Sequence, residues 1–410
     1  MESKSPLYIG IDLNDRFAMV SFYQLNMQEP ETVSTVAGSE NYTIPLVLAK
    51  RRGLGQWYYG EEAMKMAKTS EVICVDSLLR RAIDGEAIKI EDETFAAEDL
   101  LGLFIQKLVQ LPQKLGNTVG CDRLVLTLER LSRENMDLFW RIAAKLGLER
   151  QQFMVVDHKE SFYYFALNQK EDLWFHDVYL FECDNDSMFY YALKRNTRTV
   201  PQVVSITEGN RVLLSEDKDS SFLHIQQSAF ENKIISSVYL VGDGFDGGWM
   251  KESLNFLCRG RRAFVGKNLY SKGACYAAVI REQEDRWPYI YMGENEMKFN
   301  ICFKVHNRGE LEFYTLISAG KNWFETKGEC EVILAGNSQI EFWKQLPYSR
   351  EAQIETLELT DLPKRPDCTT RLRITAQPIA DDKVVIEIKD LGFGEIMKAT
   401  EKVWKYTMSI

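Results

Sequence analysis

A glycine-rich turn that follows a short apolar strand is the stretch of this sequence whose residue types could bind a nucleotide. In VYLVGDGFDGGW, residues 238–249, the apolar run leads straight into Gly242 and Gly244. Glycine lets a backbone approach a phosphate closely, because it lacks a Cβ and adopts left-handed conformations freely. Asp243 and Asp246 lie in the same turn, and their carboxylates oppose the binding of an anion. We therefore expect the turn to keep the shape of a nucleotide loop without its chemistry.

Two acidic hairpins repeat one layout. LYIGIDLNDRFAMVSFYQL (7–25) and VYLFECDNDSMFYYALK (178–194) each contain an apolar strand, an acidic residue, an Asn-Asp turn and an aromatic-rich return strand. The acidic residues are Asp12 and Glu182. Recurrence of one supersecondary unit, followed by similar elements, predicts an internal duplication. Asp12 and Glu182 either organise a divalent metal or begin solvated turns, and the turn interpretation is favoured.

Other candidate residues also have a structural interpretation beside a functional one. Asp184 and Asp186 could hold Mg²⁺ or Ca²⁺, but no glutamate follows at the spacing of an EF-hand, so a simple turn is favoured. Arg80 is expected to be a charge on a helix surface, and His158 a hydrogen-bonded packing residue. SFYYF, residues 161–165, is expected to be the packed face of a helix.

Alternating strands and helices must position these residues over most of the chain. FAAEDLLGLFIQKLVQL (95–111) has the apolar spacing of an amphipathic helix, and Ser132 is placed to cap the helix that follows it. This alternation predicts an α/β architecture. From about residue 288 the pattern changes to short strands separated by turn residues, which predicts an all-β sandwich. The last stretch, residues 393–407, is expected to be a terminal helix or a loose tail.

Composition excludes several classes of function. The 410 residues suit two or three domains, and a net charge of −10 argues against binding to nucleic acid. The N-terminus lacks the pattern of a secretory signal, and no apolar run is long enough to cross a membrane. Eight scattered cysteines without a C-x-x-C pair fit reduced thiols better than disulfides or zinc. We expect a cytoplasmic protein with no membrane partner.

The order of the segments resembles the ATPase domain of DnaK-type chaperones, in the superfamily that also contains actin, MreB and hexokinase. The fold that this resemblance implies is an α/β actin-like ATPase fold with duplicated ribonuclease-H-like halves, followed by an all-β sandwich that resembles the chaperone peptide-binding domain. Its parts would be a first lobe at 1–172, a reduced second lobe at 173–287 and the sandwich at 288–410. The matching segments are YIGIDLNDRFAMVSFY (8–23), WYYGEEAMKMA (57–67), VYLFECDNDSMFYYAL (178–193), VYLVGDGFDGGW (238–249), SKGACYAAV (271–279) and residues 359–395.

The resemblance also implies a nucleotide cleft whose residues depart from the family pattern. The glycines and threonines that surround phosphate in the family are replaced by acidic and amide residues. At about 4 Å and an effective dielectric constant of about 20, each contact between a carboxylate and a phosphate would be unfavourable by ~4 kcal/mol. The candidate cleft residues are Asp12, Asn14 and Asp15 in the first loop, Asp184, Asp186 and Ser187 in the second, Gly242, Asp243 and Gly244 in the adenosine loop, and Gly273 in the helix at 271–279.

Catalytic positions of the family are altered as well. Arg80 matches by spacing the lysine that positions the attacking water, and its planar fork is not equivalent to an ammonium group. His158 and Lys159 replace a glutamate-proline pair. The segment between the second hairpin and the glycine turn is short, which removes one wall of the cleft.

Three hypotheses for function follow. The first is a DnaK-like protein with a degenerate nucleotide site that acts as a non-catalytic protein- or peptide-binding scaffold or chaperone-like factor. It needs no cofactor and has a protein or peptide partner, bound by a surface around residues 299–345 that includes Trp323 and Phe324. The second is a divergent Mg-dependent ATPase, with Asp12 and Glu182 on the metal and Arg80 and Ser187 on ATP. The third is an actin- or MreB-like filament component. We favour the first.

Overall fold

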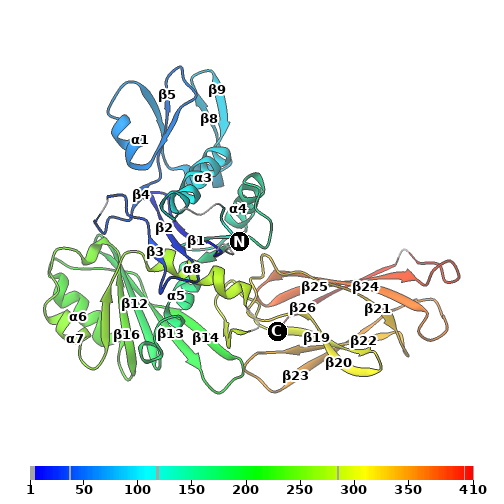
Figure 1. Cartoon of the computed structure of the whole chain (residues 1–410). Coiled ribbons are helices and arrows are strands. Elements are labelled where there is room, and N and C mark those ends of the chain that lie inside the picture. Colours follow the sequence, from blue (N-terminus) through cyan, green and yellow to red (C-terminus); the bar gives the residue numbers. More distant parts are fainter. Residues whose placement is uncertain (1–4, 37, 117–119, 284–285, 401, 410) are drawn as a thin grey trace. The chain divides into compact units, whose positions relative to one another are not determined.

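The computed structural model describes residues 5–36, 38–116, 120–283, 286–400 and 402–409. The chain divides into two compact units (Figure 1). Unit 1 comprises residues 1–194 and 206–287, and unit 2 comprises residues 195–205 and 288–410. The longer segment of unit 2 begins at residue 288, which is also the first residue of the predicted third domain. The segment 195–205 belongs to unit 2, whereas the sequence predicts that it is part of the second lobe.

The first sheet of unit 1 is built around the first acidic hairpin. Its strand order is β11-β10-β1-β2-β3, and β4 also pairs with β2. The hairpin strands β1 and β2 are antiparallel, whereas β1 with β10 and β10 with β11 are parallel. The strands are β1 (Tyr8–Leu13), β2 (Phe17–Tyr23), β3 (Glu31–Thr32), β4 (Ile44–Pro45), β10 (Arg123–Leu128) and β11 (Phe153–Asp157).

The second sheet repeats this arrangement around the second acidic hairpin. Its strand order is β17-β16-β12-β13-β14, with β15 also paired with β13. Again the hairpin is antiparallel, and β12 with β16 and β16 with β17 are parallel. In unit 2, the start of β14 pairs with β18 (Tyr289–Tyr291). The strands of the second sheet are β12 (Asp177–Asp184), β13 (Ser187–Asn196), β14 (Gln202–Glu208), β15 (Val212–Leu213), β16 (Ile235–Val241) and β17 (Arg262–Val265).

Two helices in contact with each other, α5 (His158–Leu167) and α8 (Leu269–Glu282), connect the sheets of unit 1. α8 packs on β1, β10 and β2, and Phe162 and Phe165 of α5 contact the ring of Tyr239 in β16. Both helices are therefore largely buried, as predicted for the aromatic stretch 161–165.

The other helices cover the sheets or form a smaller part of unit 1. Ser132 caps α4 in a reciprocal capping box with Asn135, as the sequence predicted for this end of the helix. In Figure 1 the smaller part lies above α3 and contains two small sheets, β6-β5-β7 and β8-β9. Its elements and the remaining helices of unit 1 are β5 (Leu48–Arg51), β6 (Trp57–Tyr59), α1 (Gly60–Met66), β7 (Val72–Val75), α2 (Leu78–Ile83), β8 (Ala87–Ile90), β9 (Glu93–Ala96), α3 (Ala97–Gly116), α4 (Arg133–Lys145), η1 (Glu171–Leu173), α6 (Lys218–Ala229), η2 (Asp243–Phe245) and α7 (Glu252–Leu257).

Unit 2 contains two antiparallel four-stranded sheets that share one hydrophobic core. The orders are β20-β19-β22-β23 and β21-β24-β25-β26. Phe299, Ile301 and Phe342 from one side and Ile374 and Ile386 from the other are fully buried in the common core. The strands are β19 (Asn300–Asn307), β20 (Glu310–Ile317), β21 (Gly328–Leu334), β22 (Gln339–Gln345), β23 (Ala352–Glu358), β24 (Thr370–Ala380), β25 (Lys383–Gly392) and β26 (Val403–Ser409).

The end of the chain corrects one prediction. The expected terminal helix or loose tail at 393–407 is instead a turn region followed by β26, which pairs with β25. Alternation explains the result, because Trp404 and Met408 are buried in the core and Lys405 is exposed. The alternation of buried and exposed residues spans only the seven residues of β26, and the polar residues before it make the pattern hard to recognise in the sequence.

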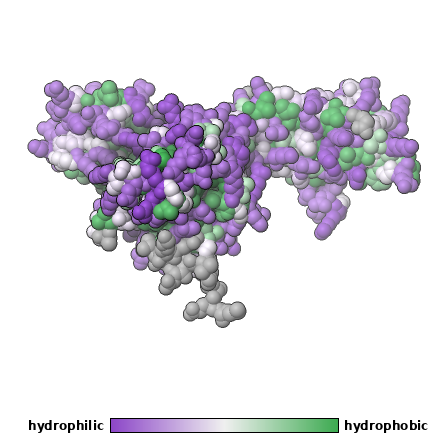
Figure 2. Space-filling model, turned by 90° about the horizontal axis from the view of Figure 1, so that it is seen from above, coloured by the Kyte–Doolittle hydropathy of each residue, from purple (hydrophilic) through white to green (hydrophobic). Residues whose placement is uncertain are grey.

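One face of the molecule is mainly polar. In the face shown in Figure 2, hydrophilic side chains predominate and hydrophobic ones occur in small groups. Within the described ranges, no helix has the length and apolar composition needed to cross a membrane.

Candidate functional site

Asp12 and His158 form the buried centre of the candidate cleft in unit 1. Asp12 lies in β1 and is 5% exposed, and His158 is the first residue of α5 and is 6% exposed. The Nε2 atom of His158 is 2.8 Å from Oδ1 of Asp12. The imidazole stacks on the ring of Tyr270, with centroids 3.7 Å apart and planes 9° apart. The prediction that His158 is a hydrogen-bonded packing residue is confirmed.

Glu182 of β12 reaches the same centre from the second sheet. Its Oε2 atom accepts a hydrogen bond of 2.5 Å from the hydroxyl of Tyr270. Burial raises the pKa of Glu182 above its ordinary value, although His158 and the Tyr270 hydroxyl favour the ionised form. Burial also holds the pKa of Tyr270 well above its ordinary value, and the Glu182 charge adds to the effect. Tyr270 therefore remains a neutral donor.

The interpretation of Asp12 and Glu182 as the start of solvated turns is wrong. Both residues lie inside strands and bond to side chains of α5 and α8, which cover them. Among the residues that the structure describes, no group of three or more His, Cys, Asp or Glu side chains is arranged to hold a metal ion.

The first turn is bonded to its own chain. The side-chain oxygen of Asn14 accepts hydrogen bonds from the backbone N–H groups of Arg16 and Phe17, at 2.8 and 2.9 Å. Asp15 accepts a hydrogen bond of 2.8 Å from the backbone N–H of Arg80 at the start of α2. The carboxylate and amide oxygens of this turn thus satisfy backbone donors, as expected of an Asx turn and a helix cap.

Arg80 lies on the surface. Its side chain is 77% exposed and lies 3.9 Å from the carboxylate of Asp84, one helical turn later. The expectation of a surface charge is confirmed. Its backbone, rather than its guanidinium group, contacts the first turn.

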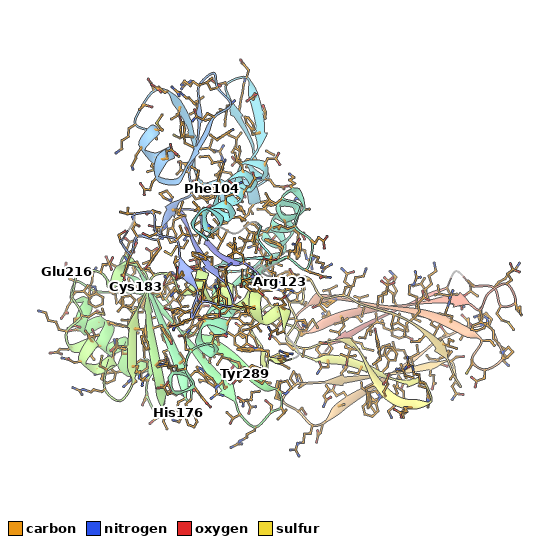
Figure 3. All side chains as sticks on the ribbon, in the orientation of Figure 1. Phe104, Arg123, His176, Cys183, Glu216 and Tyr289 are labelled. Atoms are coloured by element: carbon orange, nitrogen blue, oxygen red, sulfur yellow. The ribbon has the colours of Figure 1, made fainter. Side chains whose placement is uncertain are left out.

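The second turn is neutralised by cations from two other elements. Arg16 of the first turn donates to Asp184 at 2.5 Å, which ties the two hairpins together. Lys218, at the start of α6, forms an ion pair of 2.6 Å with Asp186. Ser187 is the first residue of β13 and pairs with Leu213 of β15. Figure 3 labels Cys183 close to this turn and His176 beyond the opposite end of β12.

The glycine turn packs against the second hairpin. A Cβ atom at Gly242, whose φ is +104°, would lie 2.2 Å from the carbonyl oxygen of Cys183, and one at Gly244 would lie 2.4 Å from the Cys183 sulfur. These glycines are needed because the turn lies against the protein's own backbone. Asp243 and Asp246 bind Nζ of Lys267 at 2.7 and 2.6 Å.

One cavity adjoins this turn. A cavity of about 240 Å³ is lined by Asp243, Lys267, Met19 and residues 40–43. Small-molecule sites usually enclose about 300–1,000 Å³. This cavity is too small for a nucleoside triphosphate.

Gly273 has a packing role. A Cβ atom there would lie 2.1 Å from the carbonyl oxygen of Ser161, where α8 crosses α5. Gly273 therefore allows the two helices to approach closely. It lies in α8 and not in either of the ion-paired turns.

Sequence reasoning missed the partners of the acidic residues. Lys218, Lys267 and Tyr270 lie far along the chain from the residues that they bind, so no local spacing indicates the contacts. Arg16 is next to Asp15 in the first turn, but it pairs with Asp184 in the second turn, so this adjacency does not indicate the contact either.

A second candidate site lies in unit 2. A cavity of about 810 Å³ opens between the ends of the two sheets. Its walls come mainly from β19, β20, β21 and β22, and β20 and β21 are edge strands of their sheets. Trp323 and Phe324 do not line it, because Trp323 packs against the core of unit 2 and the two rings pack on each other. The apolar lining includes Phe303, Val305, Tyr314, Val332, Leu334 and Ile340.

These features define a two-unit protein, with a duplicated α/β unit whose central polar groups bond to each other and a β unit that carries a cavity. The chain belongs to the family of unknown function described as DUF5716 C-terminal, whose model matches residues 29–294. Residues 296–410 match the domain of unknown function DUF8552. No curated protein matches the chain. The gap between the two matched ranges lies close to the start of the long segment of unit 2 at residue 288.

Proposed function

We propose that this protein is a DnaK-like scaffold with a degenerate nucleotide site, which binds a protein or peptide segment and does not hydrolyse ATP. The proposal includes an actin-like ATPase fold for unit 1 and a peptide-binding sandwich for unit 2. The repeated strand order of the two sheets in unit 1 supports the first part. The shared core of the two sheets in unit 2 supports the second.

The observation that carries the proposal is that each of four carboxylates in the three turns, those of Asp15, Asp184, Asp186 and Asp243, is already bonded to another group of unit 1. Asp184, Asp186 and Asp243 bond to cations, and Asp15 bonds to a backbone N–H. Exposed ion pairs such as Arg16–Asp184 contribute only about 0–1 kcal/mol each, so their loss alone would not prevent nucleotide binding. A phosphate that displaced these partners would then face the carboxylates directly. That repulsion, at ~4 kcal/mol per contact, is larger than the loss of the ion pairs.

The central pair adds a further obstacle. A nucleotide-bound metal at Asp12 would have to displace His158 from a buried, hydrogen-bonded position. Breaking a buried pair of this kind costs about 3–5 kcal/mol. The repulsion of phosphate and the cost of displacing His158 both disfavour a catalytic cleft.

Calorimetric titration with ATP and with ADP, each with and without Mg²⁺, tests the nucleotide part of the proposal. We expect no heat of binding for the native protein. The double variant Asp184→Gly/Asp186→Gly removes two carboxylates and measures how much of the exclusion they cause. Tight Mg-dependent binding to the native protein would contradict the proposal and favour a divergent ATPase.

The cavity of unit 2 is the proposed peptide site. Its volume suits several apolar side chains, and the edge strands β20 and β21 offer backbone groups to an extended segment. We expect a fluorescent apolar peptide to bind the native protein and to bind Val332→Glu more weakly, since Val332 lines the cavity. Gln377→Glu, on the exposed side of β24, is the matched control. Equal binding to all three proteins would place the peptide elsewhere.

We also propose a cytoplasmic location. All eight cysteines are free, and Cys74, Cys258 and Cys368 are exposed, which suits a reducing compartment. Fractionation of cells that produce the full-length protein tests this point.

A further inference from the structure

The two sheets of unit 1 end in equivalent edge strands that differ in exposure. β11 ends the first sheet and β17 ends the second, and each pairs in parallel with a single neighbour among the described strands. Four of the five residues of β11 are buried. Three of the four residues of β17 are exposed. The duplication thus leaves one edge covered and the other open.

The connecting helices explain this difference. The chain reaches β11 through α4, which has 13 residues and packs against β11. It reaches β17 through α7, which has six residues and packs against α6. A helix of less than two turns is too short to cover the strand that follows it.

The open edge displays apolar side chains in fixed positions. Phe264 is 38% exposed and Val265 is 62% exposed. The ring of Phe264 stacks on Tyr239 of β16, with centroids 5.3 Å apart and planes 18° apart. Edge strands of this kind are usually covered or interrupted in stable monomers, because their unpaired backbone groups attract another strand.

Positive charge is concentrated beside the same edge. The segment CRGRRAFVGK, residues 258–267, contains Arg259, Arg261, Arg262 and Lys267 but no acidic residue, in a chain with a net charge of −10. Lys267 is neutralised by the glycine turn. The pair formed by Arg262 and Asp172 is exposed on both sides, at 59% and 53%.

Two of these arginines differ in their availability. The guanidinium of Arg261 lies over the rings of Phe230 and Phe256, at 4.5 and 5.2 Å from their centroids. Arg259 is exposed and forms no ion pair with the described residues. The edge therefore presents unpaired backbone groups, apolar side chains and accessible positive charge together.

We propose that the edge of β17 binds an extended acidic segment of a partner protein, which adds to the sheet as a further strand. Backbone hydrogen bonds to β17 supply the pairing. Because successive residues of a strand point to opposite faces, apolar side chains of the segment pack beside Val265 on one face, and its carboxylates pair with Arg262 on the other face and with Arg259 before the strand. This site lies in unit 1. It depends neither on the cavity of unit 2 nor on the state of the nucleotide cleft.

Fluorescence anisotropy with a labelled peptide of alternating Glu and Val residues tests the proposal on the full-length protein at low salt. We expect binding that weakens at least about tenfold in Arg259→Glu, which replaces an attractive charge by a repulsive one, and about tenfold in Val265→Ser, which removes an apolar contact worth roughly 1.4 kcal/mol without adding a charge. Both side chains are exposed, so both variants should retain the native circular dichroism spectrum and melting temperature. Arg52→Glu, an equal charge change on an exposed residue next to β5, is the matched control and should bind the peptide as the native protein does.

Two altered peptides separate strand addition from simple charge attraction. A peptide in which Lys replaces Glu should not bind. A peptide N-methylated at alternate residues keeps its charge but loses backbone donors, and it should also fail to bind. If the N-methylated peptide bound at full strength, the partner would not bind as an added strand. If Arg52→Glu weakened binding as much as Arg259→Glu, the peptide would not bind specifically at the edge of β17. If the native protein dimerises and Val265→Ser abolishes the dimer, a second copy occupies the edge, and the proposal is overturned.

Discussion

At the scale of a single side chain, His158 links the two sheets of unit 1. It is hydrogen-bonded to Asp12 of the first sheet and stacks on Tyr270, which bonds to Glu182 of the second sheet. Burial lowers the pKa of His158, but the charge and hydrogen bond of Asp12 outweigh burial and raise it above its ordinary value of 6.5. A raised pKa in the folded state means that protonation stabilises the fold. This contribution is fully present below pH 6.5 and is lost as the pH rises through the folded-state pKa.

The pH dependence of stability tests this role of His158. We expect the free energy of unfolding in urea to fall as the pH is raised above 6.5, and His158→Gln to reduce this slope. His224→Gln is the matched control, because His224 is exposed on α6. An unchanged slope in His158→Gln would show that other groups cause the dependence.

Gln226 is a second residue whose environment predicts a measurable effect. It is fully buried in α6, and neither atom of its amide group has a hydrogen-bond partner among the described residues. An unsatisfied buried amide costs about 1–3 kcal/mol. We expect Gln226→Met, which keeps the shape, to raise the free energy of unfolding by roughly 1 kcal/mol. Gln227→Met, one exposed position later, should leave it unchanged, and a loss of stability in Gln226→Met would mean that the amide is satisfied.

At the scale of elements, one buried carboxylate holds the last strands of unit 2 together. Asp390 of β25 is 0% exposed and accepts two hydrogen bonds from Arg365, at 2.7 and 2.8 Å. It also accepts hydrogen bonds from the backbone N–H groups of Gly392 and Thr400 and from the Thr400 hydroxyl. The carboxylate thus fixes the segments before β24 and before β26 to β25.

Removal of this charge should destabilise unit 2. We expect Asp390→Asn to lower the free energy of unfolding by about 3–5 kcal/mol, because Arg365 would remain buried without its partner. Burial raises the pKa of Asp390, but the bonds from Arg365, Gly392 and Thr400 outweigh it and lower the pKa below 3.8. The stabilisation is therefore present above pH 3.8 and is lost as the pH falls further. Asp361→Asn, in an exposed pair with Lys402, is the control and should change stability by less than about 1 kcal/mol.

The elements were largely predictable from sequence, whereas the candidate site was not. Apolar spacing located α3, α4 and the strands of unit 2, because each pattern is local. The glycine turn was recognised, but its closeness to Cys183 depends on strands 50 and more residues apart. The pair Asp186–Lys218 is likewise formed only when α6 folds onto the second sheet, and the pair Asp243–Lys267 only when β17 pairs with β16. Local spacing thus identified the candidate residues, but tertiary contacts determine which groups they bond to.

At the scale of the whole molecule, the division into two units predicts independent folding of the C-terminal part. The buried cluster between the two four-stranded sheets of unit 2 extends from Met297 to Met408, and Arg365 and Asp390 lie within the same range. Residues 296–410, the range of the second family model, therefore contain this whole cluster and the buried ion pair. The hairpin segment 195–205 pairs with β18, which precedes this range.

We expect residues 296–410 to fold alone, since the described residues of the cluster between the two sheets all lie within this range. A single cooperative unfolding transition in urea, with a free energy in the range of about 5–15 kcal/mol, would be the expected result. The Asp390→Asn change should reduce this value as much in the fragment as in the full chain, because the carboxylate and its partners are all retained. A fragment without a cooperative transition would show that the core requires the 195–205 hairpin or unit 1. A fragment that folds and binds the apolar peptide with the affinity of the full chain would place the peptide site within unit 2 alone.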